Sequence, residues 1–271
     1  MMVQNEQEKN VSEAFSRQSV VFDAIDSENA IHTWIRSRVR NEVLSHIKVG
    51  ARMLELNCGT GIDSVFFAQR GFSVLATDNA DGMLSVLQNK ATHLGLDDRL
   101  NTRKCSFNKL EELGQQKFDY VFSNFGGLNC TDDLKSVLHK IDGLLEPGGM
   151  FTLVIMPKVC PWEMAMALKG YFRTAFRRFK TNGARSHVEG VYFRTHYYPA
   201  LYVLKNVPQD YRLCSLRGLS IVVPPPFIER FVERYPRLFA VLEKLENRIW
   251  DKRPFNRWCD HYMITMQKPL L

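Results

Sequence analysis

Several features that would place this sequence in a special class of protein are absent from it. The longest apolar run, MFTLVIM at 150–156, is far shorter than the roughly 20 residues that a membrane-spanning helix requires. The amino-terminal stretch MMVQNEQEKN is polar and lacks the apolar core of a secretory signal. Internal repeats and low-complexity tracts are also missing. We therefore expect a soluble, cytoplasmic, globular protein.

Metal-ligand patterns are missing as well. The six cysteines form no C-x-x-C pair and have no histidine at ligand spacing, which predicts reduced thiols and no metal site. Basic residues are plentiful, since 36 lysines and arginines against 29 acidic residues give a net charge of +7. That charge would suit nucleic acid, anionic lipid or an acidic carrier protein, but many soluble enzymes are mildly basic. Charge alone leaves the partner open.

After residue 50 the chain alternates short apolar runs with amphipathic stretches. The predicted strands are RMLELN at 52–57, FSVLATD at 72–78, RLNTRKCSF at 99–107, FDYVFSNF at 118–125 and MFTLVIM at 150–156. The predicted helices are DSVFFAQRG at 63–71, DGMLSVLQNKATHLG at 81–95 and DDLKSVLHKIDGLLEPGG at 132–149. Strands separated by helices indicate a mostly parallel sheet covered on both faces. The sequence thus predicts a doubly wound α/β domain.

The remaining segments flank or interrupt this domain. Residues 11–47 have the apolar spacing of a helix, residues 210–223 and 261–268 read as late strands, and residues 226–250 read as a long helix that Pro236 bends or divides. We divide the chain into four parts. They are an N-terminal helical cap at 1–50, a core at 51–157, an inserted substrate cover at 158–207 and C-terminal strands and helix at 208–271 that complete the sheet.

The stretch MLELNCGTGID at 53–63 runs from a strand through a glycine turn into a helix, as many nucleotide-binding sites do. A dinucleotide site would have the pattern G-x-G-x-x-G, whereas the matching positions hold Asn57, Gly59 and Ile62. The acidic residues Glu55 and Asp63 flank the turn instead. A carboxylate at the mouth of the turn would repel a pyrophosphate but suit a ligand that carries an ammonium and a sulfonium. This chemistry indicates S-adenosylmethionine.

Two further positions support a nucleoside ligand. Asp78 closes the second strand about twenty residues after the turn, where a carboxylate can accept both hydroxyls of a ribose. Ser106 and the backbone of Phe107 follow the third strand, where they would meet an adenine edge. NAD would use the same carboxylate, and a serine after a strand is commonly a turn residue. These two signals therefore support the cofactor only together with the glycine turn.

The motifs LELNCGTG, ATDNADGML and FDYVFSNFGGLNCTDDL, followed by the strand after LEPGG, resemble a class I S-adenosylmethionine-dependent methyltransferase of the small-molecule branch. The resemblance covers about the middle two fifths of the chain and implies a Rossmann-like sheet. It also implies a cofactor site with S-adenosyl-L-homocysteine as the product. The implied cofactor residues are Glu55, Asn57, Cys58, Gly59, Thr60 and Gly61 around the methionine portion, Asp78 at the ribose, Asn79, Met83, Ser106 and Phe107 at the adenine, and Asn124 and Phe125 beside the sulfonium.

One position departs from that pattern, and the cap adds three candidates. The family usually has glycine where this sequence has Asn57, but asparagine tolerates a positive φ next best, so we expect the turn to be kept. The segment AFSRQSVVFDAIDSENAIHTWIRSRVR at 14–40 resembles the helical cap of small-molecule members. By analogy Phe15, Arg17 and Phe22 fold over the cofactor, whereas simple packing of that helix on the sheet is the alternative.

The acceptor is predicted less directly. Nucleic-acid and glutamine methyltransferases commonly carry Pro-Pro and an aromatic after the fourth strand, but here the sequence is SNFGG at 123–127. Residues 161–180 mix aromatic and basic residues, which suits a membrane surface, a phosphate-bearing carrier or single-stranded nucleic acid. Such a helix more commonly packs its aromatics on the core while its arginines snorkel to solvent. The preferred acceptor is an apolar or aromatic small molecule.

A hydroxyl acceptor would require a base, for which SHVEGVYFRTHYY at 186–198 offers His187, Glu189, His196 and Tyr197. His196, on a predicted strand of the cover, is the first choice, although many family members need no base. Two rival functions stay open. An RNA or protein methyltransferase would fit the basic charge, and a non-catalytic cofactor-binding module would fit the exchange of glycine for Asn57.

Overall fold

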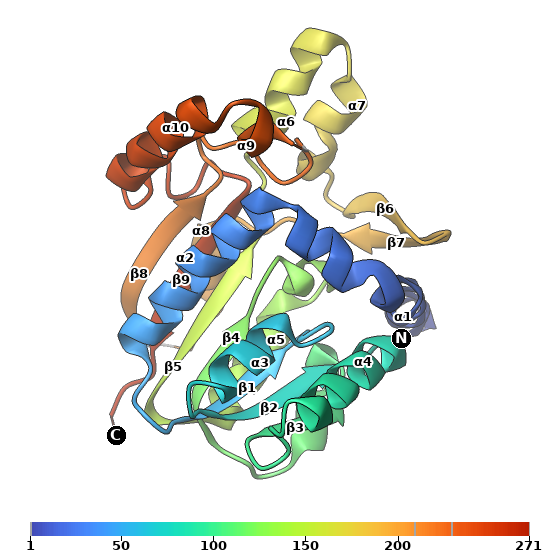
Figure 1. The fold of residues 1–271 in the computed structure, drawn as a ribbon, viewed down its shortest axis with the longest axis vertical. Coiled ribbons are helices and arrows are strands. Elements are labelled where there is room, and N and C mark those ends of the chain that lie inside the picture. The colour runs from blue at the N-terminus through green and yellow to red at the C-terminus, as the bar shows by residue number, and fades with distance from the viewer. Residues whose placement is uncertain (1, 209, 229, 271) are drawn as a thin grey trace.

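A seven-stranded sheet in the order β3-β2-β1-β4-β5-β9-β8 forms the centre of this computed structural model, which describes residues 2–208, 210–228 and 230–270 (Figure 1). Its strands are β1 (Arg52–Leu56), β2 (Ser73–Asp78), β3 (Leu100–Lys104), β4 (Phe118–Ser123), β5 (Leu145–Ile155), β8 (Arg212–Leu219) and β9 (His261–Gln267). Strands β1 to β5 are parallel, and β9 runs antiparallel between β5 and β8. Because of that reversal, β9 begins at the edge where the parallel strands end.

Helices cover both faces of the sheet, which confirms the predicted doubly wound, Rossmann-like α/β fold. Helices α2 (Ala30–His46), α3 (Ile62–Ala68) and α4 (Asp81–His93) share a buried core with the sheet on one side, and α5 (Leu134–Leu144) and α8 (Ala200–Asn206) do so on the other. The central strands are buried on both faces, as expected of apolar strands between two helical layers. This core fixes the loops at the carboxyl ends of β1, β2 and β4.

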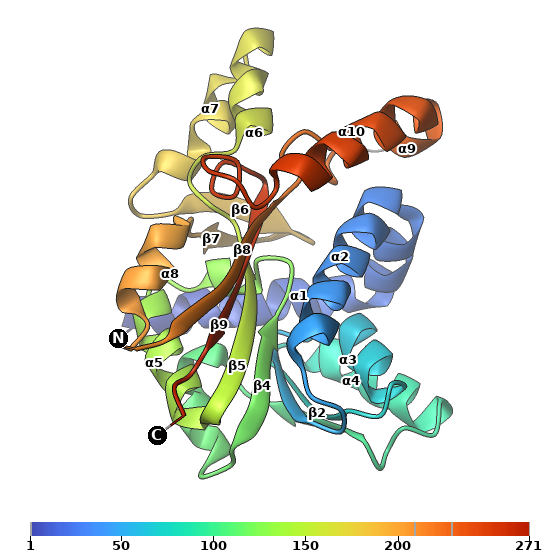
Figure 2. The ribbon, with the colours of Figure 1, turned by 90° about the vertical axis from the view of Figure 1, so that its left-hand side faces the viewer.

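The amino-terminal region differs from the predicted helix at 11–47. Helix α1 (Met2–Glu28) begins nine residues earlier than expected, and α2 is a separate helix. The break occurs at Asn29, whose side chain accepts hydrogen bonds from the backbone N–H groups of Ile31 (3.0 Å) and His32 (3.2 Å). Asparagine is a favoured N-cap because its side chain satisfies donors that the first turn leaves free. Figure 2 shows α1 crossing the sheet edge while α2 lies along one face.

Residues 161–180, here called the finger, do not form the single helix that their sequence pattern predicts. The structure has four short helical turns, α6 (Pro161–Ala165), η3 (Met166–Lys169), α7 (Phe172–Ala175) and η4 (Arg177–Phe179), which project from the body (Figures 1 and 2). The predicted packing is inverted as well, because Phe172 is 62% exposed whereas Arg178 is buried. Gly170, with a φ of 81°, ends the first half of the finger. A two-stranded hairpin of β6 (Ala184–Val188) and β7 (Val191–Thr195) follows.

The C-terminal part agrees with the predicted order of strand, helix and strand. Pro236 divides the predicted long helix into α9 (Phe231–Arg234) and α10 (Pro236–Ile249), as a residue without a backbone N–H does at a first helical position. Two further 3-10 turns, η1 (Phe107–Leu113) and η2 (Gly127–Cys130), follow β3 and β4. No helix among residues 2–208, 210–228 and 230–270 is both long enough and apolar enough to cross a membrane.

Candidate functional site

The turn after β1 has the left-handed geometry that its glycines allow. Asn57, Gly59 and Gly61 have φ values of 47°, 56° and 75°. Asn57 is held there because its Oδ1 accepts a hydrogen bond from Ser123 Oγ (2.7 Å) and its Nδ2 donates to the Asn124 carbonyl (3.2 Å). The structure thus confirms that asparagine keeps the turn. It also ties the turn to the loop after β4.

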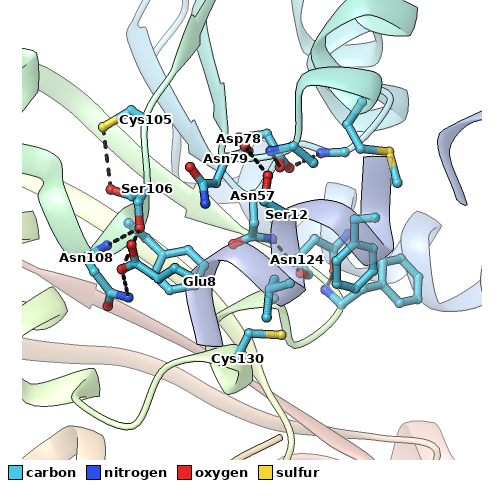
Figure 3. Close-up of a pocket in the computed structure, with 18 of the residues that line it drawn as sticks. Glu8, Ser12, Asn57, Asp78, Asn79, Cys105, Ser106, Asn108, Asn124 and Cys130 are labelled. Carbon is cyan, nitrogen blue, oxygen red and sulfur yellow. Dashed lines mark hydrogen bonds between the residues drawn. The ribbon is translucent and has the colours of Figure 1, made fainter. Parts of the chain in front are cut away.

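A cavity opens beside this turn at the carboxyl ends of β1, β2, β3 and β4 (Figure 3). It contains eleven of the sixteen residues predicted to bind the cofactor. They are Phe15, Phe22, Asn57, Gly59, Asp78, Asn79, Met83, Ser106, Phe107, Asn124 and Phe125. A cavity at this edge of an open parallel sheet is the usual ligand position of such folds. The sequence motifs therefore converge on one site.

Helix α1 forms the roof of the cavity. Glu8, Val11, Ser12, Phe15 and Phe22 line it, a spacing that places them on one helical face. Ser12 Oγ donates to the Asn79 carbonyl (2.8 Å), which fastens the roof to the end of β2. Glu8, Val11 and Ser12 were not among the predicted residues, because Glu8 precedes the predicted start of the helix and the other two precede the segment 14–40 that resembles the helical cap. The i, i+3, i+4, i+7 pattern of these positions was the available signal.

The other end of the roof is fastened to the glycine turn. Thr60 Oγ1 donates to Asp23 of α1 (2.5 Å), and Lys90 of α4 pairs with Asp23 and donates to the Thr60 carbonyl (2.9 Å). Gly82 of α4 lets the helices touch, since a Cβ there would lie 2.5 Å from the Ser16 carbonyl oxygen. The cap is therefore in direct contact with the core on both sides of the cavity.

Asp78 occupies the floor of the cavity at the end of β2. Its two carboxylate oxygens accept hydrogen bonds from the backbone N–H groups of Gly59 and Ala80, both at 2.9 Å. Burial raises the pKa of Asp78, while those two N–H donors oppose that rise. The carboxyl group is thus oriented by the turn itself. Each carboxylate oxygen keeps a further lone pair for a hydroxyl donor.

Glu55 and Asp63 do not lie at the mouth of the turn, as the sequence analysis assumed. Both are buried beneath it and outside the cavity lining. Ser64 Oγ donates to Glu55, whereas Asp63 accepts hydrogen bonds from Arg36, Arg40 and Asn124. Burial, and then the neighbouring Asp63 carboxylate, raise the pKa of Glu55 to about 8. These acidic residues therefore support the site from behind.

Four other predicted residues also lie outside the lining of the cavity. Cys58, Thr60 and Gly61 belong to the turn but face away, and a Cβ on Gly61 would lie 2.0 Å from Leu87 Cδ1. Arg17 pairs with Glu13 and donates to the Glu189 carbonyl (3.1 Å) of the hairpin turn. The side chain of Arg17 thus joins cap and cover and does not reach into the cavity.

At the far end of the cavity a carboxylate from α1 meets the loop after β3. Glu8 Oε1 accepts hydrogen bonds from Asn108 Nδ2 (2.6 Å) and Ser106 Oγ (3.2 Å), as Figure 3 shows. Ser106 also caps η1 by accepting from the Asn108 backbone N–H (3.2 Å). The end of the cavity beside Phe107 therefore carries acceptors as well as an apolar wall.

Phe125 closes the opposite end, next to Asn124. Its backbone has a φ of 48°, and its N–H donates to the Asn124 side chain (2.8 Å). Around the ring lie the guanidinium of Arg36 at 4.6 Å and the rings of His32 at 5.3 Å and His261 at 6.4 Å. Burial lowers the pKa of His32, so that imidazole is neutral near pH 7. Phe125 thus lies at the junction between the cavity and a region that carries His32 and His261.

The predicted bases do not meet Phe125. His196 follows β7, packs against Gly183 and lines a separate surface hollow, and burial lowers its pKa. His187 and Glu189 are exposed in the hairpin, and burial raises the pKa of the Tyr197 hydroxyl. The geometry therefore does not support His196 as the group beside the reacting centre.

His261, which was not predicted from the sequence, does lie beside Phe125, and its ring contacts the neighbouring Asp260. The His261 Nδ1 atom is 2.8 Å from Asp260 Oδ2, and both side chains are buried. The signal was available in the adjacent Asp and His at the start of the last predicted strand. It is informative only once that strand is known to be antiparallel, because its beginning then falls at the ligand edge of the sheet.

The chain matches the family model described as a methyltransferase domain over residues 53–149, which include the turn and Asp78. It is also 25% identical over 221 residues to a demethylmenaquinone methyltransferase of Listeria monocytogenes, an alignment that covers 79% of this chain and 91% of the relative. The protein is a class I S-adenosylmethionine-dependent methyltransferase. S-adenosylmethionine is accordingly its methyl donor.

Solved structures share the fold of this methyltransferase. The [4+2]-cyclase SpnF has a TM-score of 0.63 at 14% identity and covers 96% of both chains. A 1,6-didemethyltoxoflavin-N1-methyltransferase of Burkholderia thailandensis, crystallised with S-adenosylhomocysteine, has a TM-score of 0.57 at 16% identity and covers 98% of this chain and 90% of its own. One fold therefore accompanies two kinds of reaction, and the reaction is argued from the site.

The cavity fits the donor on this structure's own geometry. An oriented carboxylate lies at Asp78, and a Cβ built on Gly59 would lie 3.8 Å from Phe22 and 3.9 Å from the Met83 sulfur, so the glycine leaves its side of the cavity open. Acceptors lie at the Phe107 end, and an aromatic wall lies at the Phe125 end. The methyltransferase thus has polar groups where a nucleoside needs them and apolar walls elsewhere.

Replacement of Asp78 by alanine should weaken binding of S-adenosylhomocysteine by at least about tenfold, because hydrogen bonds to a charged group contribute roughly 1.5–3 kcal/mol each. Isothermal titration calorimetry measures the change. Asp81→Ala is the matched control, since Asp81 is an exposed neighbour that lies outside the cavity lining. Equal affinities of the Asp78 variant and the unmodified protein would refute the site assignment.

Replacement of Glu55 by glutamine should change how stability depends on pH. The unfolded carboxyl group ionises near pH 4.5 and the folded one near pH 8, so the unmodified protein loses stability as pH rises between these values. Glutamine cannot ionise and removes that loss. Thermal melts at pH 6 and pH 9 should show a smaller fall of Tm in the variant, and parallel falls would contradict the raised pKa of Glu55.

Proposed function

We propose that this methyltransferase transfers a methyl group to an apolar or aromatic small molecule. The observation that carries the proposal is the aromatic enclosure where the acceptor must meet the donor. Phe15 and Phe22 of the cap and Phe125 of the β4 loop line that part of the cavity, and Phe193 of the hairpin packs on Phe15 with the ring centroids 5.8 Å apart. Such walls favour a ligand that loses apolar surface to them. A demethylmenaquinone methyltransferase among the relatives is consistent with this class.

Each residue of the site has a proposed task in this reaction. Asp78 binds the ribose hydroxyls, and Ser106, Phe107, Asn79 and Met83 border the adenine. The turn at 57–61 and Asn124 hold the methionine portion. The bound donor supplies an activated methyl group on a sulfonium. The protein therefore needs to align the acceptor, exclude water and, for a hydroxyl acceptor, remove a proton.

The basic residues of the finger favour this function over an RNA or protein methyltransferase. Arg178 is buried, and the partly exposed Arg177 is held by two hydrogen bonds of 2.7 Å to Glu163, so both guanidinium groups are already paired within the finger. The β4 loop reads SNFGG at 123–127 and lacks the paired prolines. These two paired arginines therefore do not join the exposed basic residues Lys169, Arg173 and Lys180 in a continuous electrostatic track for nucleic acid.

The exposed part of the finger is proposed to contact an anionic membrane surface, from which an apolar acceptor would be drawn. Leu168 is 91% exposed, and Tyr171, Phe172 and Phe176 are each more than half exposed. The exposed charges among them, Lys169, Arg173 and Lys180, are all basic, because the finger's one acid, Glu163, is buried. Aromatic and basic side chains without exposed acids are typical of an interfacial contact with anionic lipid.

All six cysteines are free, which fits action in the reducing cytoplasm.

Label transfer tests the acceptor class. The protein is incubated with methyl-labelled S-adenosylmethionine and an extract of its host, and the organic-soluble, nucleic-acid and protein fractions are then separated. We expect label in the organic fraction, and Asp78→Ala should reduce it at limiting donor. Label confined to nucleic acid or protein would replace the proposal with the corresponding alternative, and no transfer would favour a non-catalytic module.

Vesicle sedimentation tests the finger. The unmodified protein should pellet with vesicles that contain phosphatidylglycerol, less so with pure phosphatidylcholine and less so at high salt. Leu168→Glu combined with Phe172→Glu should reduce the bound fraction about tenfold. Val49→Glu is the control because Val49 is fully exposed in the loop between α2 and β1, outside the finger. If the unmodified protein stays in the supernatant with anionic vesicles, the finger has another partner, such as a carrier protein.

A further inference from the structure

A cluster of buried ionic groups lies where the base of the finger meets the start of β9. Arg178 is only 2% exposed, and its Nη2 atom donates to Glu163 Oε1 (2.7 Å) and Asp260 Oδ1 (2.6 Å). Its Nη1 atom donates to the backbone carbonyls of Asp260 (2.8 Å) and Pro157 (3.2 Å). A buried ion pair remains charged only when such hydrogen bonds offset the loss of water. The cluster therefore holds Asp260 in one position.

This cluster is not a metal centre. Ligand atoms of Cys160, Glu163 and Asp260 lie within 4.8 Å of one another, which is a spacing that a cation could use. However, the Arg178 guanidinium already bonds both carboxylates, and burial raises the pKa of the Cys160 thiol to about 12. The positive charge that two buried carboxylates need is thus supplied by the arginine.

Asp260 in turn orients His261. Its Oδ1 atom accepts from Arg178, while its Oδ2 atom is 2.8 Å from His261 Nδ1. Burial disfavours the charged carboxylate, but His261 and Arg178 outweigh burial and hold the pKa of Asp260 well below its usual range. A carboxylate that stays ionised keeps the proton of the imidazole on Nδ1. The lone pair of His261 is then on Nε2.

The Nε2 atom faces the loop that follows β4. A Cβ built on Gly126 would lie 3.3 Å from His261 Nε2, and the next residue back, Phe125, lines the cavity. Hydrogen bonds to other described residues involve Nδ1 of this imidazole and not Nε2. Gly126 has no side chain and a φ of 65°, so the loop approaches the imidazole closely. A nitrogen atom that has no hydrogen-bond partner among the described residues therefore lies next to Phe125, which lines the cavity.

We propose that His261 is the proton acceptor for a hydroxyl-bearing substrate, with Asp260 as its positioning residue. The inference rests on the proposed function, since it assigns the base of that same site. The acceptor oxygen forms a bond to the methyl carbon as the carbon–sulfur bond breaks. The electron pair of the broken bond stays on the sulfur, which becomes a neutral thioether. The proton of the hydroxyl passes to His261 Nε2, and the resulting imidazolium is stabilised by the Asp260 carboxylate. The substrate class is a phenol or an enol, whose hydroxyl is acidic enough for an imidazole to deprotonate during transfer.

Other charged groups surround this imidazole. Asp260 and Arg178 lie on its Nδ1 side, with Glu163 and Cys160 beyond them. His32 of α2 lies across the Phe125 ring, near Asp26 and Arg36, and its pKa is lowered by burial. Asp260 is the one carboxylate in direct contact with His261 among the described residues. The charged groups that face His261 are therefore Asp260 and Arg178 on its Nδ1 side.

Nuclear magnetic resonance of 15N-histidine-labelled protein tests the geometry without an acceptor. At pH 8 the His261 Nε2 atom should show the shift of an unprotonated nitrogen, and Nδ1 should show that of a protonated one. Asp260→Asn should lose this fixed tautomer. A proton found on Nε2 at pH 8 would overturn the proposal, because no lone pair would then face the Phe125 loop.

The label-transfer assay tests the chemistry. His261→Asn should lower the rate of product formation at saturating donor by at least about 100-fold, the usual contribution of a general base. The affinity for S-adenosylhomocysteine should be unchanged, and the fall of the rate at acid pH should disappear. His93→Asn, at an exposed site on α4, is the matched control. A His261→Asn variant with the full rate or an unchanged pH profile would refute the base.

Failure of the inference and failure of the proposed function give different results. If the unmodified protein labels an organic product and His261→Asn does so equally fast, only the inference fails. If the unmodified protein labels nothing in the organic fraction, the proposed function fails and the inference, which rests on it, falls with it. An Asp260→Asn variant that still binds the cofactor, reacts more slowly and has a pH–rate profile shifted on its acid side would support the positioning role. A purely structural defect would not move the pH profile.

Discussion

The walls of the site depend on one buried carboxylate, that of Asp63 in the first turn of α3. It is 2% exposed and accepts hydrogen bonds from Arg36 and Arg40 of α2 and from Asn124 after β4. Arg36 continues the chain of charges to Asp26 of α1 (2.6 Å). An ionised carboxylate in the interior must be fully paired, so cap, turn and β4 loop are all drawn to one point. The position of Asp63 at a helix N-terminus adds the favourable dipole of α3.

Local sequence was enough to predict the parts of the site that local chemistry determines. The strands β1, β2 and β4 follow from their apolar residues, and Asn57 was expected in the left-handed turn because of its side chain. Asp78 ends β2, and Ser106 and Phe125 lie two residues beyond the ends of β3 and β4. The carboxyl ends of parallel strands meet at one edge. The central sheet and most of the cavity floor were therefore predictable.

The remaining parts depend on contacts between residues that are distant in the sequence. Arg178 and Asp260 are 82 positions apart, and nothing in the basic run at 177–180 distinguishes the buried arginine from its exposed neighbours. The finger was predicted with its aromatics inside for the same reason, since a mixed aromatic and basic pattern does not say which residues find partners. Glu55 was placed at the mouth of the turn because the residue pattern of a strand is a poor guide to burial at its last positions. The position of His261 at the ligand edge depends on the strand order, which the sequence pattern did not predict.

The roof of the cavity has a consequence for how a ligand enters and leaves. Helix α1 is one uninterrupted element that is fastened at Glu8 to the loop after β3 and at Asp23 to the glycine turn. A ligand beneath it is covered by a helix that is held to the core on both sides of the cavity. Entry and exit of a ligand beneath α1 are thus coupled to the contacts that Glu8 and Asp23 make, as for other helices and loops that cover a ligand site.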